Sequence, residues 1–217
     1  MDISDVLAQL ASLYARMDRA YAGYADAIGL NCEGCPDNCC RTHFRHRTIV
    51  ERLYLRRGLD SLPSQIRSML LDRARRYRAS ASQGQPGEDV IPQDCPLLEA
   101  GRCLLYEFRP MICRLHGVPW VLRRGRLAGQ VQRGCDRANQ LLQNRETPPV
   151  LDRTALYHEL ALLEQTARRL TGWSERLATT VADMIVGDFP HEASAGGPQG
   201  HVADTDGGGY NGGGPRV

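Results

Sequence analysis

Apolar and polar residues at the start of the chain alternate with the period of a helix. Apolar side chains recur at steps of three and four, at Ile3, Val6, Leu7, Leu10, Leu13, Tyr14, Met17, Tyr21 and Tyr24. Such steps place the apolar side chains on one face of a helix. We therefore predict an amphipathic helix over residues 2–27, with its tyrosines packed into a core.

Further helices are predicted at residues 48–57, 63–80, 154–170 and 173–186. Gly58 marks the end of the first. Pro63 suits the first turn of the second, because a first-turn residue needs no amide hydrogen for the helix. The last two are expected to pack as a helical hairpin around Gly172, so that residues 152–187 frame the middle of the chain.

The middle of the chain carries weaker signals for strands. Two short strands are expected around the turn at 99–102, followed by a helical turn that Pro110 opens. A second hairpin is expected over residues 118–132, although its turn lacks an Asn-Gly or Asp-Gly pair. A short helix is expected from Cys135 to Leu142. The predicted fold class is mainly α with a short antiparallel β-hairpin element.

The composition changes near the C-terminus. Residues 188–217 include GGGYNGGG and almost no aliphatic side chains, whereas residues 1–187 contain all the predicted elements. A segment of this kind cannot bury enough apolar surface to offset the entropy of ordering it. We therefore predict a single domain over 1–187, a loop at 83–93 and a Gly-rich disordered tail at 188–217.

The cysteines are the strongest chemical signal in the sequence. There are eight, at Cys32, Cys35, Cys39, Cys40, Cys95, Cys103, Cys113 and Cys135. The first four fall within NCEGCPDNCCR, whose glycine, proline, aspartate and asparagine are typical of a tight loop. Thiolates are strong ligands for zinc and for iron–sulfur clusters, and a Cys-x-x-Cys step lets one turn supply two ligands. We therefore expect a cysteine-ligated metal centre that organises the domain.

The cysteine count leaves the number of sites open. Eight thiols could supply two four-coordinate sites, or one cluster with spare thiols. Neighbouring side chains in extended backbone point to opposite sides. Hence we expect one of Cys39 and Cys40 to face the main site, and the other to face a second site or the core.

The start of the chain bears on the redox environment. It carries Asp2 and Asp5 and no uninterrupted apolar run, unlike a secretory signal. We therefore expect a cytoplasmic location, in which structural disulfides are disfavoured. A disulfide framework and inert buried thiols are the competing interpretations of the cysteines.

Charge and motifs exclude several function classes. The net charge is +2, and all 27 basic residues are arginine. That excess is small for a nucleic-acid-binding domain, and no stretch reaches the roughly 18 apolar residues of a membrane span. Neither nucleic acid nor membrane is expected as a partner. The chain also lacks a Gly-rich phosphate loop, an HExxH pair and a recognisable nucleophile motif.

Basic residues near the cysteines are candidates for supporting roles. We expect Arg41, Arg109 and Arg114 to offset the negative charge of metal-bound thiolates or to hydrogen-bond to sulfur. His43, His46 and His116 also lie near cysteines in the sequence. Each is a candidate ligand, although a surface position or a contact with a ligand is the commoner role for such a histidine.

The two cysteine-rich stretches resemble a known family. CEGCPDNCCR, followed by CPLLEAGRCLLYEFRPMICRLHG, is similar to the CxxCxxCC (YkgJ-type) family of zinc- or iron-chelating proteins. The second stretch carries the more specific matches, at Cys95-Pro96, Gly101, Cys103, Tyr106, Arg109-Pro110 and Cys113-Arg114. The resemblance covers residues 32–135. The family pattern has two residues before its CC pair, whereas this chain has three, Pro36, Asp37 and Asn38.

The resemblance implies metal binding, and related domains are labelled iron–sulfur proteins. We therefore favour an iron–sulfur cluster, held for electron transfer, redox sensing or an accessory redox role with a redox partner protein. One alternative is a zinc-binding structural or interaction module without catalysis. The other is a metal-dependent protein-modifying enzyme, because a domain of this family occurs in bacterial flagellin lysine methylases.

Overall fold

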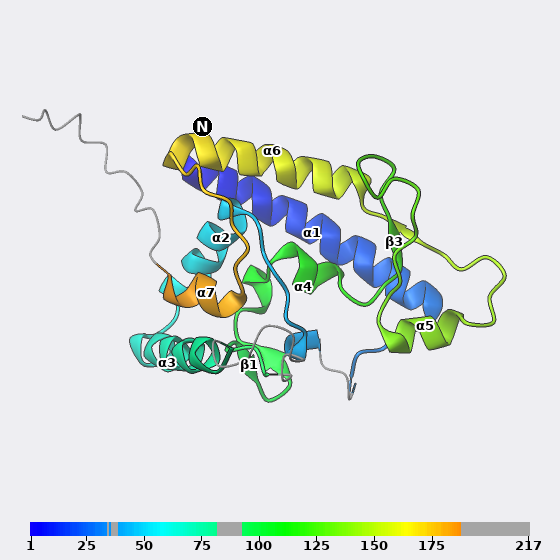
Figure 1. The fold of residues 1–217 in the computed structure, drawn as a ribbon, viewed down its shortest axis with the longest axis horizontal. Coiled ribbons are helices and arrows are strands. Elements are labelled where there is room, and N and C mark those ends of the chain that lie inside the picture. Colours follow the sequence, from blue (N-terminus) through cyan, green and yellow to red (C-terminus); the bar gives the residue numbers. More distant parts are fainter. Residues whose placement is uncertain (34, 36–38, 82–92, 188–217) are drawn as a thin grey trace, which may run out of the picture.

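The protein is mainly helical, as predicted, and its strands are short. The computed structural model describes residues 1–33, 35, 39–81 and 93–187 (Figure 1). The helices are α1 Ile3–Ile28, α2 Ile49–Asp60, α3 Ser64–Ala81, α4 Met111–Leu115, α5 Asp136–Leu142, α6 Thr154–Thr171 and α7 Val181–Val186, with 3-10 turns η1 Cys39–Arg41 and η2 Tyr106–Phe108. The strands are β1 Leu98–Glu99, β2 Arg102–Cys103, β3 Trp120–Val121 and β4 Leu151–Asp152.

Helices α1 and α6 lie side by side along one edge of the molecule (Figure 1). A capping box between Asp2 and Asp5 starts α1, because each side chain accepts a hydrogen bond from the other residue's amide. The helix ends at Gly29, which takes the left-handed conformation at φ 72°. The apolar face of α1 packs with α2, α4 and α6 in the first of three hydrophobic clusters.

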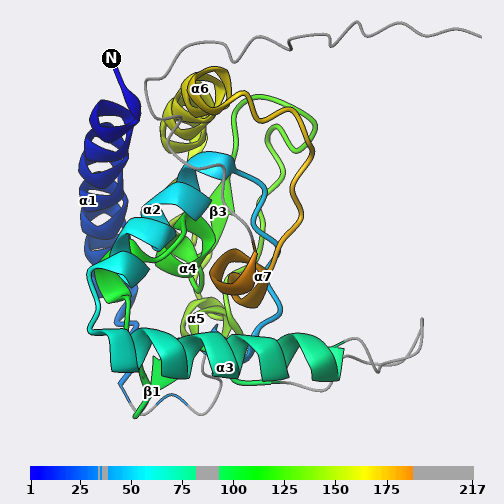
Figure 2. The same cartoon turned by 90° about the vertical axis from the view of Figure 1, so that its left-hand side faces the viewer.

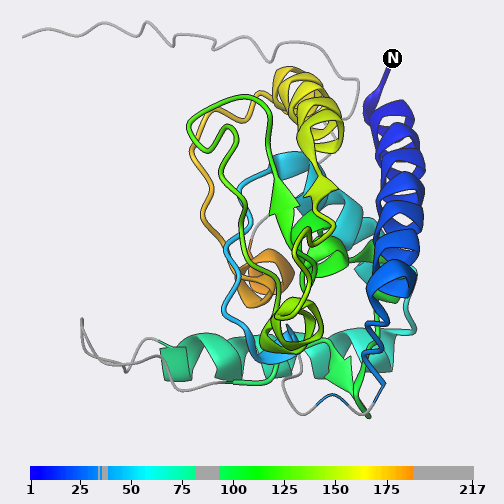
Figure 3. The same ribbon diagram turned by 90° about the vertical axis from the view of Figure 1, so that its right-hand side faces the viewer.

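The other two clusters lie at either end of the molecule. Figure 2 shows α3 running across the base, where it packs with α2, α7 and the β1–β2 hairpin. Figure 3 shows α5 close to the C-terminal end of α1, where Ala138 and Leu142 pack with Ile28 and Leu30. These two clusters hold the chain on opposite sides of the cysteine-rich region.

A buried carboxylate connects three of the helices. Glu51 of α2 is 4% exposed and accepts hydrogen bonds from the Tyr14 hydroxyl of α1 and from the Met111 amide, at 3.0 and 2.6 Å. The Met111 amide belongs to the first turn of α4, which has no partner within the helix. Glu51 therefore fixes the position of α4, which carries Cys113.

The β1–β2 hairpin agrees with the sequence prediction. Leu98 pairs with Cys103 and Glu99 with Arg102 in an antiparallel ladder. Ala100 and Gly101 form the turn between the strands with positive φ of 45° and 79°. The helical turn after Pro110 and the short helix after Cys135 are also present, as α4 and α5.

The predicted hairpin at 118–132 is largely wrong. Trp120 and Gln132 do exchange two backbone hydrogen bonds, but this is a single bridge. The ladder partner of β3 is instead β4, which runs parallel to it. Turns at Gly125 and Gly129, with φ of 85° and 73°, coil the chain before a second strand can extend.

The predicted helix at 173–186 is also wrong in extent and in packing. Only α7 is helical, and it packs against α3 and α2 rather than forming a hairpin with α6. Thr179 exchanges backbone hydrogen bonds with His46 at 2.7 and 2.9 Å, which holds the preceding segment extended. Thr180 and Asp183 then form a capping box that starts α7.

Two sequence predictions fall largely outside the described residues. These are the loop at 83–93, of which only Gln93 is described, and the tail at 188–217. Within the described residues, no helix has both the length and the apolar character that crossing a membrane requires.

Candidate metal centre

All eight cysteines line one cavity of about 660 Å³. They come from the segment after α1, from η1, from the β1–β2 hairpin and the residues just before it, from α4 and from the start of α5. In chain order they are Cys32, Cys35, Cys39, Cys40, Cys95, Cys103, Cys113 and Cys135. Leu30, Phe44, Leu97 and Val181 contribute apolar walls. Thiols from distant parts of the sequence, between Cys32 and Cys135, are therefore brought together around a single space.

Four of the thiols gather where the end of α1 meets the start of α5. We call Cys32, Cys35, Cys39 and Cys135 the loop set. Cys135 is the N-cap of α5, where its sulfur accepts from the Ala138 amide at 3.5 Å, and its own amide donates to the Gly117 carbonyl at 3.0 Å. The Tyr21 hydroxyl lies 3.7 Å from the Cys32 sulfur.

The remaining thiols gather around the β1–β2 hairpin. We call Cys40, Cys95, Cys103 and Cys113 the hairpin set. The Cys95 amide donates to the Cys40 carbonyl at 2.8 Å, which joins η1 to the segment before β1. Cys95 and Cys103 both pack against the cluster between α3 and α7. Cys113 lies on α4, which Glu51 anchors.

Electrostatic coupling follows the same grouping. Burial raises the pKa of Cys39 to about 12, and the charges of Cys135 and Cys32 contribute further. Burial likewise raises the pKa of Cys95 to about 12, with contributions from Cys103 and Cys40. The largest thiol contributions to these two groups thus come from their own sets, and Cys39 is also coupled to its neighbour Cys40.

The other hairpin thiols behave in the same way. Burial raises the pKa of Cys103 to about 11, and Cys40 contributes. Burial also raises the pKa of Cys113 well above its usual value. The charges of Cys95 and Cys103 raise it further. Without a cation, these thiols are therefore protonated at neutral pH, and a metal that replaced the protons would stabilise the thiolates.

The arginines expected near the cysteines differ in position. Arg109 lines the cavity, and its charge lowers the pKa of Cys40 against the effect of burial. Arg114 also lines the cavity, but its guanidinium lies over the Tyr14 ring and donates to Asp18 and to the carbonyl of Arg109. It therefore braces α4, and its charge opposes the effect of burial on the pKa of Cys103.

Arg41 lies elsewhere. Its side chain is 55% exposed and donates to Asp94 at 2.8 Å, and it is absent from the described lining of the cavity. An exposed pair of this kind contributes little to stability. Its contact with Asp94 instead joins η1 to the segment before Cys95.

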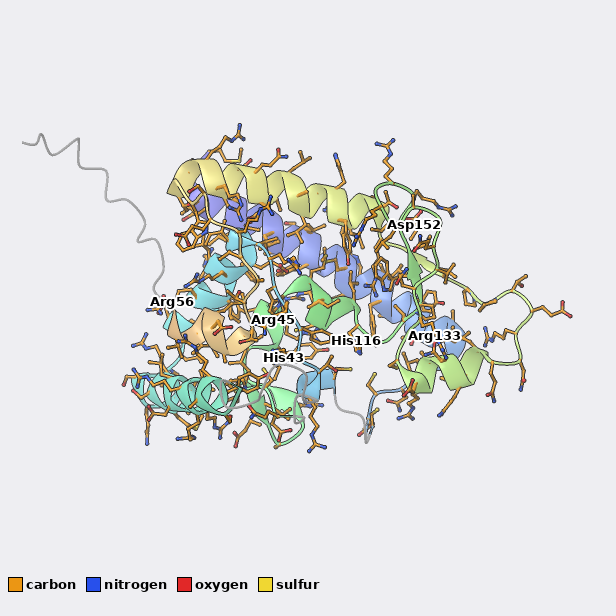
Figure 4. All side chains as sticks on the ribbon, viewed as in Figure 1. His43, Arg45, Arg56, His116, Arg133 and Asp152 are labelled. Carbon is orange, nitrogen blue, oxygen red and sulfur yellow. The ribbon has the colours of Figure 1, made fainter. Side chains whose placement is uncertain are left out.

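The three candidate histidines also differ in their position relative to the cavity. His43 hydrogen-bonds to the Tyr77 hydroxyl at 2.8 Å and lies outside the described lining. His116 and His46 both line the cavity, and burial lowers the pKa of each. Figure 4 places His43 and His116 in the central part of the molecule, between α7 and α5. His46 is 3% exposed, and its Nε2 has no hydrogen-bond partner among the described residues.

Two residues of the site were not identified from the sequence. Tyr21 was assigned to core packing by its helical spacing, yet its hydroxyl faces the loop set. Gly117 has φ 104°, and a Cβ there would lie 3.2 Å from the Tyr21 hydroxyl and 3.7 Å from the Cys135 sulfur. The position of Tyr21 shortly before the cysteine loop was a usable signal, whereas nothing near Gly117 in the sequence pointed to Cys135.

The donor set fits a soft metal in its chemistry. All eight cysteines are thiols rather than disulfides, and they share one partly apolar cavity. Across residues 1–33, 35, 39–81 and 93–187, however, no three histidine, cysteine, aspartate or glutamate side chains form a compact group that could hold an ion. The sulfurs therefore surround the cavity without forming a coordination sphere.

The chain was compared with protein families, curated proteins and solved structures. No protein family, curated protein or solved structure was found to match the chain.

Proposed function

We propose that this chain is a metal-binding protein that holds an iron–sulfur cofactor on its cysteines. The single observation that supports the proposal is the convergence of all eight cysteines on one cavity. Inert thiols would have no reason to converge, because a cysteine that only fills space can lie anywhere in a core. The resemblance to the CxxCxxCC family supports the same interpretation.

The size of the cavity favours a cluster over a bare zinc ion. Four sulfurs at the zinc–thiolate bond length lie roughly 3.8 Å apart, which leaves little space between them. The thiols of this chain surround about 660 Å³. An iron–sulfur cluster contains several irons and bridging sulfides, so it takes up more space between its thiolate ligands than a single ion does, and it supplies one-electron redox chemistry.

The protein's own residues suit a redox role. Leu30, Phe44 and Leu97 give the cavity apolar walls, while Arg109 places a positive charge near the hairpin set. Cys32 is exposed, so one end of the cavity lies close to the surface. A redox partner protein could approach there. We propose electron transfer, redox sensing or an accessory redox role in the cytoplasm, without nucleic acid or membrane as a partner.

The test is metal analysis of the full chain purified without oxygen, together with a UV–visible spectrum. We expect iron and acid-labile sulfide in stoichiometric amounts and a broad visible band. Zinc alone in a colourless protein, with failed reconstitution by iron and sulfide, would favour the zinc-binding structural module. Methylation of a protein substrate that depends on the bound metal would favour the metal-dependent enzyme related to flagellin lysine methylases. Intact disulfides without metal would contradict the proposal.

A further inference from the structure

Cys39 and Cys40 are consecutive residues of the 3-10 turn η1. Successive residues of such a turn are separated by roughly 120° around its axis, because three residues complete one turn. Their side chains therefore diverge, and both sulfurs cannot easily join one coordination sphere. The turn is well placed to serve two sites, one on either side of it.

The surroundings of the two cysteines differ accordingly. On one side, the Tyr21 hydroxyl contacts Cys32, and a Cβ at Gly117 would lie within 4 Å of both that hydroxyl and the Cys135 sulfur. Cys135 packs against the cluster of α1 and α5. The loop set thus belongs to this end of the molecule.

On the other side, the backbone of Cys40 is hydrogen-bonded to that of Cys95. Cys95 and Cys103 pack against a different cluster, that of α3 and α7. Cys135 of the loop set and Cys95 and Cys103 of the hairpin set therefore pack against different clusters, and η1 supplies one thiol to each set at the cavity that the sets share.

We infer that the cavity holds two separate metal centres, each bound by four thiolates, and that the Cys39–Cys40 step divides them. The loop set of Cys32, Cys35, Cys39 and Cys135 holds one centre, and the hairpin set of Cys40, Cys95, Cys103 and Cys113 holds the other. Four thiolates are the full complement of a structural zinc site and of a common iron–sulfur cluster. This inference rests on the proposed function, which requires that the cysteines bind metal but does not require two separate centres.

The division is tested with alanine variants of the full chain, reconstituted with iron and sulfide without oxygen. Cys39→Ala and Cys40→Ala are a matched pair, because the two residues are adjacent and both half-buried. Each variant loses one centre, and the fractions of metal lost by the two add up to the wild-type content. The double variant Cys39→Ala/Cys135→Ala loses no more than Cys39→Ala alone, whereas Cys39→Ala/Cys40→Ala loses nearly all metal.

Two results would overturn the division while leaving metal binding in place. Complete loss of metal from both Cys39→Ala and Cys40→Ala would indicate one shared centre. Full retention in either variant would indicate one centre with spare thiols. Circular dichroism verifies folding, and Cys103→Ala on the β1–β2 hairpin replaces Cys40→Ala if that variant fails to fold. Wild-type protein that takes up no metal would overturn the proposed function and the division together.

Discussion

The two ends of the cysteine cavity are built differently. The hairpin set lies on a β-hairpin, a 3-10 turn and a helix, and Glu51 and Arg114 brace that helix through hydrogen bonds. The loop set lies on the segment after α1, on η1 and at the cap of α5, and its Cys32 is exposed. The hairpin set is therefore framed by more regular structure, whereas the loop set lies more on short connecting segments.

Charge separates the two ends as well. Burial raises the pKa of Cys40 and raises that of Cys103 to about 11; the charge of Arg109 opposes both shifts, and the charge of Arg114 opposes the second. Burial also raises the pKa of Cys39, to about 12, and there the charges of neighbouring thiols add to the effect. Guanidinium groups therefore lie near the hairpin set, where they would offset part of the negative charge of metal-bound thiolates.

The largest expected effect is at Glu51. Glu51→Leu removes the acceptor of the Tyr14 hydroxyl and of the Met111 amide. Leaving such buried donors unpaired costs about 3 kcal/mol of unfolding free energy, measured by urea denaturation. The exposed Glu159, which pairs with Arg16 at the surface, provides the control. Glu159→Leu is expected to cost less than about 1 kcal/mol.

Glu51→Leu also tests the comparison itself. Because α4 carries Cys113, metal loss from the folded variant should fall on the hairpin set. Equal loss from both sets in folded protein would contradict the proposed framing.

The next effect is at Gly117. Gly117→Ala forces a side chain into a φ of 104° and within 3.2 Å of the Tyr21 hydroxyl. We expect a cost of about 2 kcal/mol in thermal or urea unfolding, because backbone strain and crowding add. Gly129→Ala is the matched control, since Gly129 has φ 73° and no atom of the described residues lies within 4 Å of the place its Cβ would take. Equal costs for the two variants would mean that Gly117 does not crowd the loop set.

Metal removal compares the two ends directly. On addition of a chelator, we expect metal to leave the loop set roughly tenfold faster than the hairpin set, because supporting contacts around ligands change metal retention by about this factor. The release is followed by absorbance and by metal content over time. A single release rate for all the metal would contradict the contrast between the ends.

The smallest expected effect is at Tyr21. Tyr21→Phe removes the hydroxyl near Cys32, and a lost hydrogen bond of about 1 kcal/mol corresponds to release of loop-set metal roughly fivefold faster. Tyr24→Phe is the matched control one turn along α1, because the buried Tyr24 hydroxyl has no partner among the described residues. Identical release rates in the two variants would remove Tyr21 from the site.

The periodicity of apolar residues predicted the long helices, because the pattern of buried side chains in a helix can be read from neighbouring residues. The apolar face of α1, the turn chemistry of β1–β2 and the proline before α4 are all visible in short windows of sequence. The segment 173–180 was misassigned because its conformation depends on pairing between Thr179 and His46, which are far apart in the chain. The partner of β3 was missed for the same reason, since β4 follows a long connection.

The candidate site shows the same limit. Residue type and spacing identified the cysteines, and the Cys39–Cys40 step predicted that these two side chains diverge, but the sequence could not assign the other thiols to one or the other. That assignment depends on the orientation of η1 against the hairpin and α5. The same tertiary contact brings Tyr21 and Gly117 to Cys135.

The central claim is that the cysteines of this cavity bind metal. Anomalous X-ray diffraction at the iron and zinc edges, on crystals of anaerobically prepared protein, tests it most directly. We predict two anomalous peaks inside the cavity, one surrounded by the loop set and one by the hairpin set. Anomalous density only outside the cavity, or disulfides between the eight cysteines in its place, would contradict the account.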